Sequence, residues 1–243
     1  MEERHYIELF ELEDSHWWFR GRRAVLWAML HHAALPASPE ILDAGCGTGR
    51  NLAEFGTLGV ASGVDPSPEA IGFCRRRGLE NVFQAGLEQL PFPDGRFDLM
   101  LATDVIEHID DDRRALAELH RVARPGGQLL ITVPAYTWLW SQHDDSHHHK
   151  RRYTMRRLRE RVLVSGFRPV VASYFNFLLL APIALVRATA RRQARPDGRT
   201  DYDLAPKPVA RLLDLPMRGE AKLIERGLRF PAGVSIAMLC TRA

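Results

Sequence analysis

Large apolar side chains recur at helical spacing near the start of the chain. Over residues 6–34 they follow a period of three to four positions, which is typical of a helix that buries one face. Pro36 ends the stretch, because proline cannot continue a helix. Trp17 and Trp18 fall within it, and their size favours packing against the main domain, with a lid over a ligand as the alternative. The pattern predicts an N-terminal helical extension over 1–39.

The pattern changes at Glu40 to short apolar runs that alternate with helical stretches. Runs of this length are typical of buried strands, and helices between them indicate parallel strands joined by crossovers. Helices are expected after Gly49, Pro66 and Asp110. The first five predicted strands are Ile41–Ala44, Val60–Val64, Asn81–Gln84, Phe97–Ala102 and Gln128–Val133.

An irregular segment interrupts this alternation in the second half of the chain. The stretch 136–153 is polar and rich in aromatic and histidine residues, so it is predicted to be a loop. Thr154 is a suitable cap for a helix that runs to Ser165. A sixth strand is predicted at Phe167–Tyr174 and a seventh at Val234–Thr241.

The interval between the last two predicted strands is about 60 residues, far more than a hairpin connection needs. We therefore predict a doubly wound α/β fold with a seven-stranded, mostly parallel sheet and a helical insertion before its last strand. Its predicted parts are the extension over 1–39, an α/β core over 40–174, the insertion over 175–233 and the final strand of the core over 234–243.

The insertion begins with an apolar stretch, Tyr174–Val186, and then turns to arginines between Arg187 and Arg195. The apolar stretch is too short to span a bilayer. We expect a buried helix that covers one side of the core. The alternative is an interfacial helix that touches an anionic membrane over 175–195, because apolar residues beside arginine are typical of such helices.

The composition is that of an ordinary globular protein. The chain has 243 residues, of which 46% are hydrophobic and 26% charged, and this argues against disorder and against a membrane-spanning bundle. The net charge is only +3 and the arginines cluster locally, so we expect no nucleic-acid partner. Cys46, Cys74 and Cys240 lie far apart and Met1–Glu13 is acidic, so we expect neither disulfides nor a secretory leader. A cytoplasmic protein fits best, and the insertion adds contact with the inner membrane face as an alternative.

The segment Asp43-Ala44-Gly45-Cys46-Gly47-Thr48-Gly49 directly follows a predicted buried strand and precedes a predicted helix. Such a loop lies at the carboxyl edge of a parallel sheet, where ligands bind. Its glycines let a ligand approach the backbone closely. A dinucleotide-binding loop has the spacing G-x-G-x-x-G, whereas here the spacing is G-x-G-x-G and Arg50 follows. A ligand without phosphates suits this loop better.

Asp65 ends the second predicted strand, next to the strand that carries the glycine loop. A carboxylate at this point can accept hydrogen bonds from both hydroxyls of a ribose. A simple cap of the helix after Pro66 is the alternative. The two features together favour ribose binding.

Several motifs of the first half of the chain resemble those of the class I S-adenosylmethionine-dependent methyltransferases, strongly over 40–133 and more loosely over 153–174. The motifs are the glycine loop, Asp65, Leu90-Pro91-Phe92, Phe97-Asp98-Leu99 and Asp104-Val105-Ile106-Glu107-His108. The resemblance implies S-adenosylmethionine as the cofactor. Its implied binding residues are Asp43, Gly45, Cys46 and Gly47 at the methionine end, Asp65 at the ribose, Gly86 and Leu87 at the adenine, and Asp104.

The adenine end departs from the family pattern. Members often have an acidic residue after the third strand that reaches the adenine amino group, whereas this chain has Gly86 there. Backbone groups of Gly86 and Leu87 are one replacement for that acid, and the carboxylate of Glu88 is the other.

Methyl transfer from a sulfonium is an in-line displacement, so alignment and the exclusion of water matter more than dedicated catalytic groups. A carboxylate pressed against the sulfonium would stabilise the ground state, so we interpret Asp104 and Glu107 as positioning groups. If the acceptor is a hydroxyl, His108 is a candidate general base. A residue that only begins a helix is the equal alternative.

The most unusual local feature is the histidine-rich stretch 143–153. Adjacent histidines in a loop do not define a ligand geometry, and Lys150, Arg151 and Arg152 would oppose a cation, so we predict no metal site. Because the loop follows the fifth strand, we expect it to cover the acceptor pocket, with His149 and Arg152 as candidate catalytic residues. A solvated structural loop is the alternative.

These features predict methyl transfer from S-adenosylmethionine to a small-molecule or lipid-like acceptor, at oxygen rather than at carbon or nitrogen. A noncatalytic protein that binds the cofactor is the alternative, because the adenine acid is missing and no general base is unambiguous. The glycine spacing disfavours a nicotinamide-dependent oxidoreductase.

Overall fold

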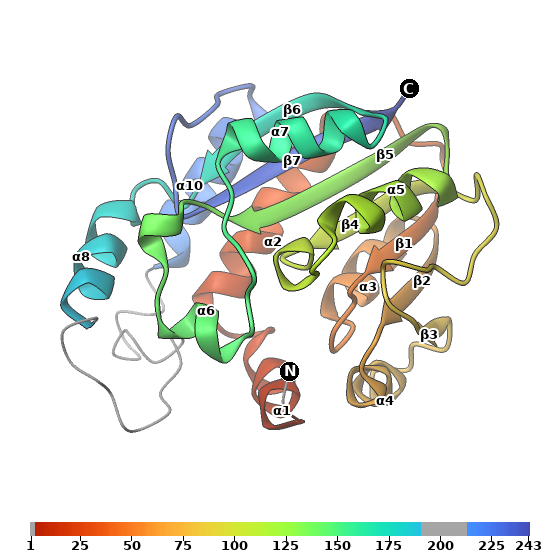
Figure 1. Cartoon of the computed structure of the whole chain (residues 1–243), viewed down its shortest axis with the longest axis horizontal. Coiled ribbons are helices and arrows are strands. Elements are labelled where there is room, and N and C mark those ends of the chain that lie inside the picture. Colours follow the sequence, from red (N-terminus) through yellow and green to blue (C-terminus); the bar gives the residue numbers. More distant parts are fainter. Residues whose placement is uncertain (1–2, 191–212) are drawn as a thin grey trace.

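The computed structural model describes residues 3–190 and 213–243. Its centre is a seven-stranded sheet in the order β3-β2-β1-β4-β5-β7-β6 (Figure 1). Strands β1 to β6 run parallel, and β7 runs antiparallel between β5 and β6. The strands are β1 Glu40–Ala44, β2 Val60–Asp65, β3 Val82–Gln84, β4 Phe97–Thr103, β5 Ala123–Pro134, β6 Phe167–Phe175 and β7 Ser235–Arg242.

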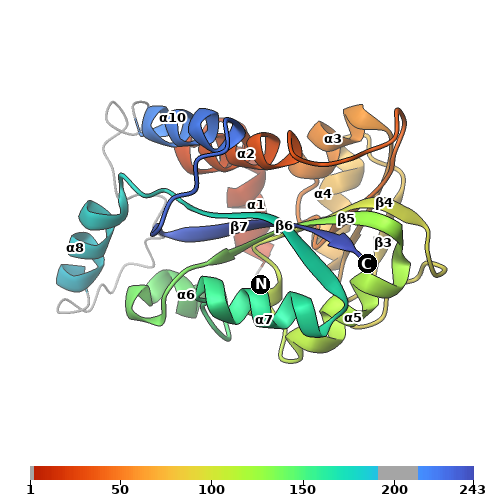
Figure 2. The same cartoon turned by 90° about the horizontal axis from the view of Figure 1, so that it is seen from above.

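Helices cover both faces of this sheet. Figure 2 shows α2, α3 and α10 over one face and α5 and α7 over the other, while α6 and α8 lie beyond the end to which β5 points. The helices are α1 Glu3–Leu12, α2 Trp17–Leu30, α3 Arg50–Phe55, α4 Pro68–Arg76, α5 Asp112–Val122, α6 Gln142–Ser146, α7 Met155–Val164, α8 Leu180–Ala190 and α10 Asp214–Glu225.

Each face of the sheet has its own apolar core, because successive strand residues point to opposite faces. In β5, Leu129 and Ile131 belong to the cluster that contains residues of α5 and α7, whereas Leu130 belongs to the cluster with α2 and α10. The central strands are therefore buried on both sides, which is why they are nearly continuous apolar runs. This arrangement confirms the predicted doubly wound α/β fold.

The predicted strands agree with the observed ones to within one residue at either end, except at β5. Strand β5 begins at Ala123, opposite Phe97, and regular pairing resumes at Gln128, opposite Leu99. The residues between them shift the register, and Gly126 has a φ of 76°. The predicted start at Gln128 therefore marks only the regular part of the strand.

The N-terminal extension forms two helices rather than one. Glu13 follows α1 and accepts hydrogen bonds from Thr48 and Arg77. His16 then caps α2 by accepting the Trp18 N–H. The break depends on a contact with a loop 35 positions away in sequence, which helical periodicity cannot indicate.

Helix α8 is not the buried helix that the apolar stretch predicted. Its described side chains are half-buried or exposed, and Leu185 is 66% exposed. The helix lies at one end of the molecule (Figure 1). The arginines Arg191, Arg192 and Arg195 lie outside the described residues.

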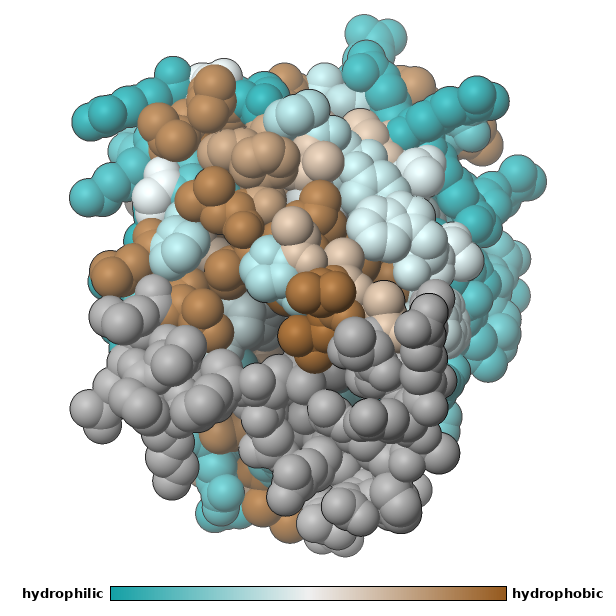
Figure 3. Space-filling view, turned by 90° about the vertical axis from the view of Figure 1, so that its left-hand side faces the viewer, coloured by the Kyte–Doolittle hydropathy of each residue, from teal (hydrophilic) through white to brown (hydrophobic). Residues whose placement is uncertain are grey.

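The face of the molecule that carries α8 displays apolar side chains in its middle (Figure 3). In the segment that joins β6 to α8 and in α8 itself, the exposed apolar residues are Phe177, Leu178, Leu185 and Val186. Within 3–190 and 213–243, no helix is long and apolar enough to cross a membrane.

Helix α10 packs so closely on α2 that no side chain fits at Gly21. A Cβ at this position would lie 2.6 Å from Sδ and 2.8 Å from Cβ of Met217. We expect Gly21→Ala to lower the free energy of unfolding by about 1–3 kcal/mol through overpacking. Urea unfolding measures the change.

The matched control is Gly219→Ala in α10, where a Cβ meets no atom within 4 Å. This change should stabilise the protein by about 0.5–1 kcal/mol, because alanine loses less backbone entropy than glycine on folding. In a Met217→Ala background, which costs stability of its own, Gly21→Ala should cost less than it does in the wild type. A Gly21→Ala protein as stable as Gly219→Ala would contradict the close packing.

Candidate functional site

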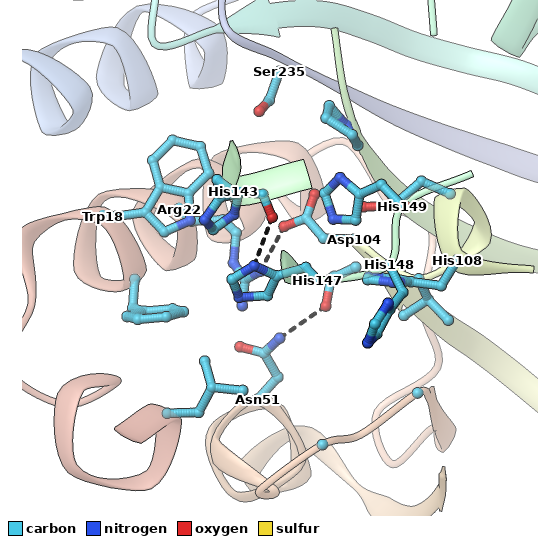
Figure 4. A pocket seen from close by; sticks show the side chains of 18 of the residues that line it. Trp18, Arg22, Asn51, Asp104, His108, His143, His147, His148, His149 and Ser235 are labelled. Carbon is cyan, nitrogen blue, oxygen red and sulfur yellow. Dashed lines mark hydrogen bonds and ion pairs between the residues drawn. The ribbon is translucent and has the colours of Figure 1, made fainter. Parts of the chain in front are cut away.

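A cavity of about 580 Å³ opens at the carboxyl edge of the sheet. Its walls come from the loops that follow β1 to β5 and from α2 and α8. Figure 4 shows Trp18 and Arg22 of α2 on one side, with His108, His148 and His149 on the other. Segments far apart in the chain therefore meet where ligands bind in sheets of this kind.

The glycine loop after β1 forms part of the cavity wall. Gly45 and Gly47 have φ values of 79° and 52°, which other residues rarely adopt. A Cβ at Gly45 would lie 2.5 Å from the Val105 side chain, whereas a Cβ at Gly47 would meet no atom within 4 Å. Gly47 therefore leaves open space for a ligand. Cys46 also lines the cavity, and its sulfur lies 3.8 Å from that of Cys74.

Asp65 lies beside this loop at the end of β2. Its Oδ2 accepts the Gly47 N–H and its Oδ1 accepts the Ser67 N–H, each at 3.0 Å. The residue lines the cavity although it is only 7% exposed, and burial raises the pKa of Asp65. Each carboxylate oxygen has a further lone pair with which it can accept a hydroxyl proton. This placement fits the ribose role that the sequence predicted.

Asp43 lies behind the glycine loop and does not line the cavity. It is 1% exposed, and neither carboxylate oxygen has a hydrogen-bond partner among the described residues. Burial, opposed by the Arg22 guanidinium, raises the pKa of Asp43 to about 7. Asp43 therefore lies behind the loop rather than in the cavity wall, and its role at the methionine end stays a prediction.

The segment after β3 forms the wall where the family pattern predicts adenine. Gly86, Leu87 and Glu88 all line the cavity. A Cβ at Gly86 would have Glu88 Oε2 as its nearest neighbour, at 4.0 Å. The backbone of this segment and the Glu88 carboxylate thus lie on the same cavity wall. Both predicted replacements for the missing acid stay predictions.

An ion pair joins the N-terminal extension to the end of β4. Asp104 has a φ of 56°, its Oδ2 accepts a hydrogen bond from Arg22 Nη1 at 2.5 Å, and its Oδ1 accepts one from Thr132 Oγ1 at 3.1 Å. Asp104 and Arg22 both line the cavity. The predicted cofactor-binding residue Asp104 therefore faces the cavity as half of an ion pair.

The N-terminal extension contributes to the cavity, which the sequence interpretation had considered only as the alternative to packing. Trp17, Trp18 and Phe19 line the cavity, so packing alone does not describe them. Trp18 also stacks on Phe175 of β6, with ring centroids 6.0 Å apart. Three adjacent aromatic residues shortly before Arg22 were the sign of this role in the sequence. However, Phe175, on which Trp18 stacks, lies far along the chain.

A backbone hydrogen bond brings the histidine-rich loop to the end of β4. The Lys150 N–H donates to the Glu107 carbonyl oxygen at 2.7 Å. As a result, the rings of His108 and His149 meet edge to face, with centroids 4.6 Å apart. Both histidines line the cavity (Figure 4), so the loop lies where the sequence placed the acceptor pocket.

A buried ion pair holds this loop, which contains the short helix α6 rather than irregular structure alone. Arg152 Nε and Nη2 donate to the two carboxylate oxygens of Asp144 at 2.8 and 2.9 Å, and Arg152 Nη1 donates to the Ala135 carbonyl at 2.9 Å. His149 Nδ1 lies 2.7 Å from Asp144 Oδ1. Burial opposes ionisation, but the bonds from His149 and Arg152 lower the pKa of Asp144 below its usual range. These contacts make Arg152 a positioning residue for the loop.

His108 occupies the 3-10 turn Ile106–His108 after β4. Burial, with His149 adding to the effect, lowers the pKa of His108 to about 3, and such a group takes up a proton poorly near neutral pH. Its neighbour Glu107 is fully buried with no hydrogen-bond partner for either oxygen in the described chain, and burial together with Asp104 raises the pKa of Glu107 well above its usual value. These environments give the general-base hypothesis for His108 little support.

Residues 42–131 match the family described as methyltransferase domain. Over 119 residues the chain is 36% identical to the malonyl-[acyl-carrier protein] O-methyltransferase of Serratia marcescens. The aligned region covers 45% of this chain and 46% of that protein. Over 124 residues it is 32% identical to the demethylmenaquinone methyltransferase of Tropheryma whipplei. That aligned region covers 49% of this chain and 48% of the relative. The chain spans about half the length of the curated relatives it matches.

A solved structure has the same fold over its whole length. The S-adenosylmethionine-dependent methyltransferase of Thermotoga maritima matches with a TM-score of 0.59 and 19% identity, and the match covers 100% of both chains. At this identity the likeness shows the fold alone. It agrees with the predicted Rossmann-like arrangement of the sheet.

We expect Asp43→Asn to stabilise the ligand-free protein more at pH 8 than at pH 5. Folding raises the pKa of Asp43 from an ordinary carboxyl value to about 7, so the folded state binds this proton more tightly than the unfolded state. The wild type therefore loses stability as the pH rises from about 4 to 7. Asparagine carries no charge to bury at any of these pH values.

Urea unfolding of the wild type and of Asp43→Asn at both pH values measures this effect. The difference between the two free energies of unfolding cancels the titration of acids that do not interact with Asp43. A difference that stays constant between pH 5 and pH 8 would contradict the cost of ionising Asp43.

Proposed function

We propose that the protein methylates a small-molecule or lipid-like acceptor at oxygen. Residues 42–131 match the methyltransferase-domain family, and their motifs resemble those of the class I S-adenosylmethionine-dependent methyltransferases. The cofactor of this class of domain is S-adenosylmethionine. When bound, it supplies a methyl group on a positively charged sulfur. The residues around the cavity bind it, orient the acceptor and exclude water.

The observation that carries this proposal is the position of Gly47 and Asp65 on one wall of the cavity. Gly47 leaves open space beside the loop, and its N–H holds the Asp65 carboxylate in place. The carboxylate then offers two acceptors to a ribose. No phosphate is needed for this fit, and the spacing of the loop does not favour one.

The ion pair between Asp104 and Arg22 suits the chemistry of a sulfonium. The positive charge on sulfur disappears as the methyl group moves, so a bare carboxylate beside it would stabilise the ground state more than the transition state. Arg22 lies 2.5 Å from Asp104 and offsets its charge. The pair can therefore position the ligand without slowing the transfer.

The acceptor side of the cavity combines apolar and polar walls. Trp17 and Trp18 come from α2, Ile183 comes from α8, and His148 and His149 come from the histidine-rich loop. An acceptor with an apolar body and a hydroxyl group suits this combination, because imidazole nitrogens bind hydroxyls. The Serratia marcescens relative is a malonyl-[acyl-carrier protein] O-methyltransferase.

Helix α8 supports an acceptor that is partly apolar. Its residues Ile183 and Arg187 line the cavity, while Leu185 and Val186 are exposed. The helix therefore borders the acceptor side instead of being buried in the core. Contact of this apolar face with a membrane is the alternative role for α8.

We expect Gly47→Val to abolish S-adenosylmethionine binding, because the new side chain occupies the open space beside the loop. Asp65→Ala should weaken binding at least about tenfold, or 1.4 kcal/mol, through the loss of the ribose contacts. Isothermal titration calorimetry with S-adenosylmethionine measures both.

The matched control is Gly78→Val. Gly78 also has a positive φ, of 79°, and a Cβ there meets no atom within 4 Å, but the residue does not line the cavity. It carries the same backbone strain and should bind the cofactor normally. Normal binding by a folded Gly47→Val protein would remove the glycine loop from the site.

Turnover is tested by incubating the protein with S-adenosylmethionine labelled in its methyl group and with cell extracts. We expect label in an acceptor that partitions into organic solvent. The carbon-13 chemical shift of the labelled methyl group identifies the methylated atom, because a methyl group on oxygen resonates apart from one on carbon or nitrogen. Gly47→Val is the negative control. Cofactor binding without any label transfer across extracts would support the noncatalytic alternative.

A further inference from the structure

The histidine side of the cavity brings three potential metal ligands together. Glu107 and His108 follow β4, and His149 comes from the loop after β5. One ligand atom from each of the three lies within 4.8 Å of the others. The hydrogen bond from the Lys150 N–H to the Glu107 carbonyl fixes the two segments in this arrangement.

Glu107 lacks a partner that its burial requires. The residue is fully buried, and neither carboxylate oxygen has a hydrogen-bond partner within the described chain. An isolated buried carboxyl group costs free energy unless a cation or donor accompanies it. A cation held between Glu107 and the two histidines supplies that partner.

His149 has the surroundings of a metal ligand. Histidines that bind metal usually donate their other ring N–H to a carboxylate, which fixes the tautomer and the direction of the ring. His149 Nδ1 lies 2.7 Å from Asp144 Oδ1, and Arg152 in turn holds Asp144 through two hydrogen bonds. Nδ1 is thus the donor, and Nε2 keeps the lone pair that a metal needs.

The positive charges beside the histidines are compensated. In the sequence, Lys150, Arg151 and Arg152 argued against a cation. In the structure each lies beside an acidic residue: Lys150 3.3 Å from Asp110, Arg151 3.2 Å from Asp112 and Arg152 2.8 Å from Asp144. The electrostatic objection to a metal ion therefore no longer holds.

The distances allow direct coordination. Three atoms no more than 4.8 Å apart share a point within about 2.8 Å (4.8/√3) of each, and zinc bonds to nitrogen and carboxylate oxygen are about 2.0–2.2 Å long. Movements of less than about 1 Å close the set. Two imidazoles and one carboxylate are typical of zinc sites that keep an open position, whereas magnesium and calcium prefer oxygen ligands alone.

We propose that Glu107, His108 and His149 bind a divalent transition-metal ion of the zinc type at the wall of the cavity. All three residues line the cavity, so the remaining coordination position faces the space where an acceptor enters. A hydroxyl oxygen of the acceptor is the ligand for that position. This last step rests on the proposed function, whereas binding of the ion does not.

The test is calorimetric titration of the untagged full chain with zinc chloride after dialysis against EDTA and then metal-free buffer. We expect one zinc ion per chain in the wild type. Glu107→Gln and His149→Ala should each weaken binding at least tenfold, because each removes one of three ligands. The near-isosteric Glu107→Gln keeps the volume of the buried side chain.

The matched control is His148→Ala, one position before the ligand. His148 is exposed and is not part of the ligand set, so its removal should leave zinc affinity unchanged. Thermal melts separate a lost ligand from a lost fold: zinc should raise the melting temperature of wild type and His148→Ala, but not that of a folded Glu107→Gln.

Three results would overturn the proposal: no zinc binding by the wild type, equal affinity in Glu107→Gln and wild type, or tighter binding of magnesium than of zinc. Cobalt(II) provides a further readout, because imidazole ligands change its visible absorption and the change should disappear in His149→Ala. The Gly47→Val protein should lose S-adenosylmethionine but keep zinc, so failure of the metal site and failure of the cofactor site give different results.

Discussion

A carboxylate that leaves water needs a cation or several hydrogen-bond donors, and this constraint organises the carboxyl edge of the sheet. Three acids there are paired with arginines from elsewhere in the chain or loop: Asp104 with Arg22, Asp144 with Arg152 and Glu13 with Arg77. The pairs fix the N-terminal extension and the histidine-rich loop to the core. Arginine supplies nearly all positive charge of the chain, and its planar group suits such two-point contacts. Asp65 accepts backbone N–H groups instead, whereas the carboxylate oxygens of Asp43 and Glu107 have no hydrogen-bond partner among the described residues.

Local signals explain what could be predicted from the sequence. The strands follow from apolar runs between turn residues, and the role of Gly47 follows from a spacing within seven residues. The break after α1 and the partner of Asp104 could not be predicted, because Glu13 and Arg22 act across 35 and 82 positions. The cluster proposed to bind zinc could not be predicted for the same reason: adjacent imidazoles do not define a ligand geometry, and only the fold brings His149 beside Glu107 and His108.

The parts shared with the relatives and the parts that border the acceptor are different. The family match runs from residue 42 to residue 131. It therefore includes the glycine loop and Asp65, but α2 lies before it and α8 after it. Trp18 and Ile183, which line the cavity, lie on those two helices. Under the proposed function, the matched core holds the cofactor and the segments before and after it shape the space for the acceptor.

The position of β7 has a consequence for the biosynthesis of the protein. This strand pairs with both β5 and β6, which do not pair with each other, and residues 176–234 separate it from β6. The ribosome therefore releases β6 well before the strand that gives it a hydrogen-bonding neighbour. Until then β6 has no partner on either side, and unpaired strand edges are where nascent chains associate wrongly. The half-made protein is most vulnerable while the insertion is being translated.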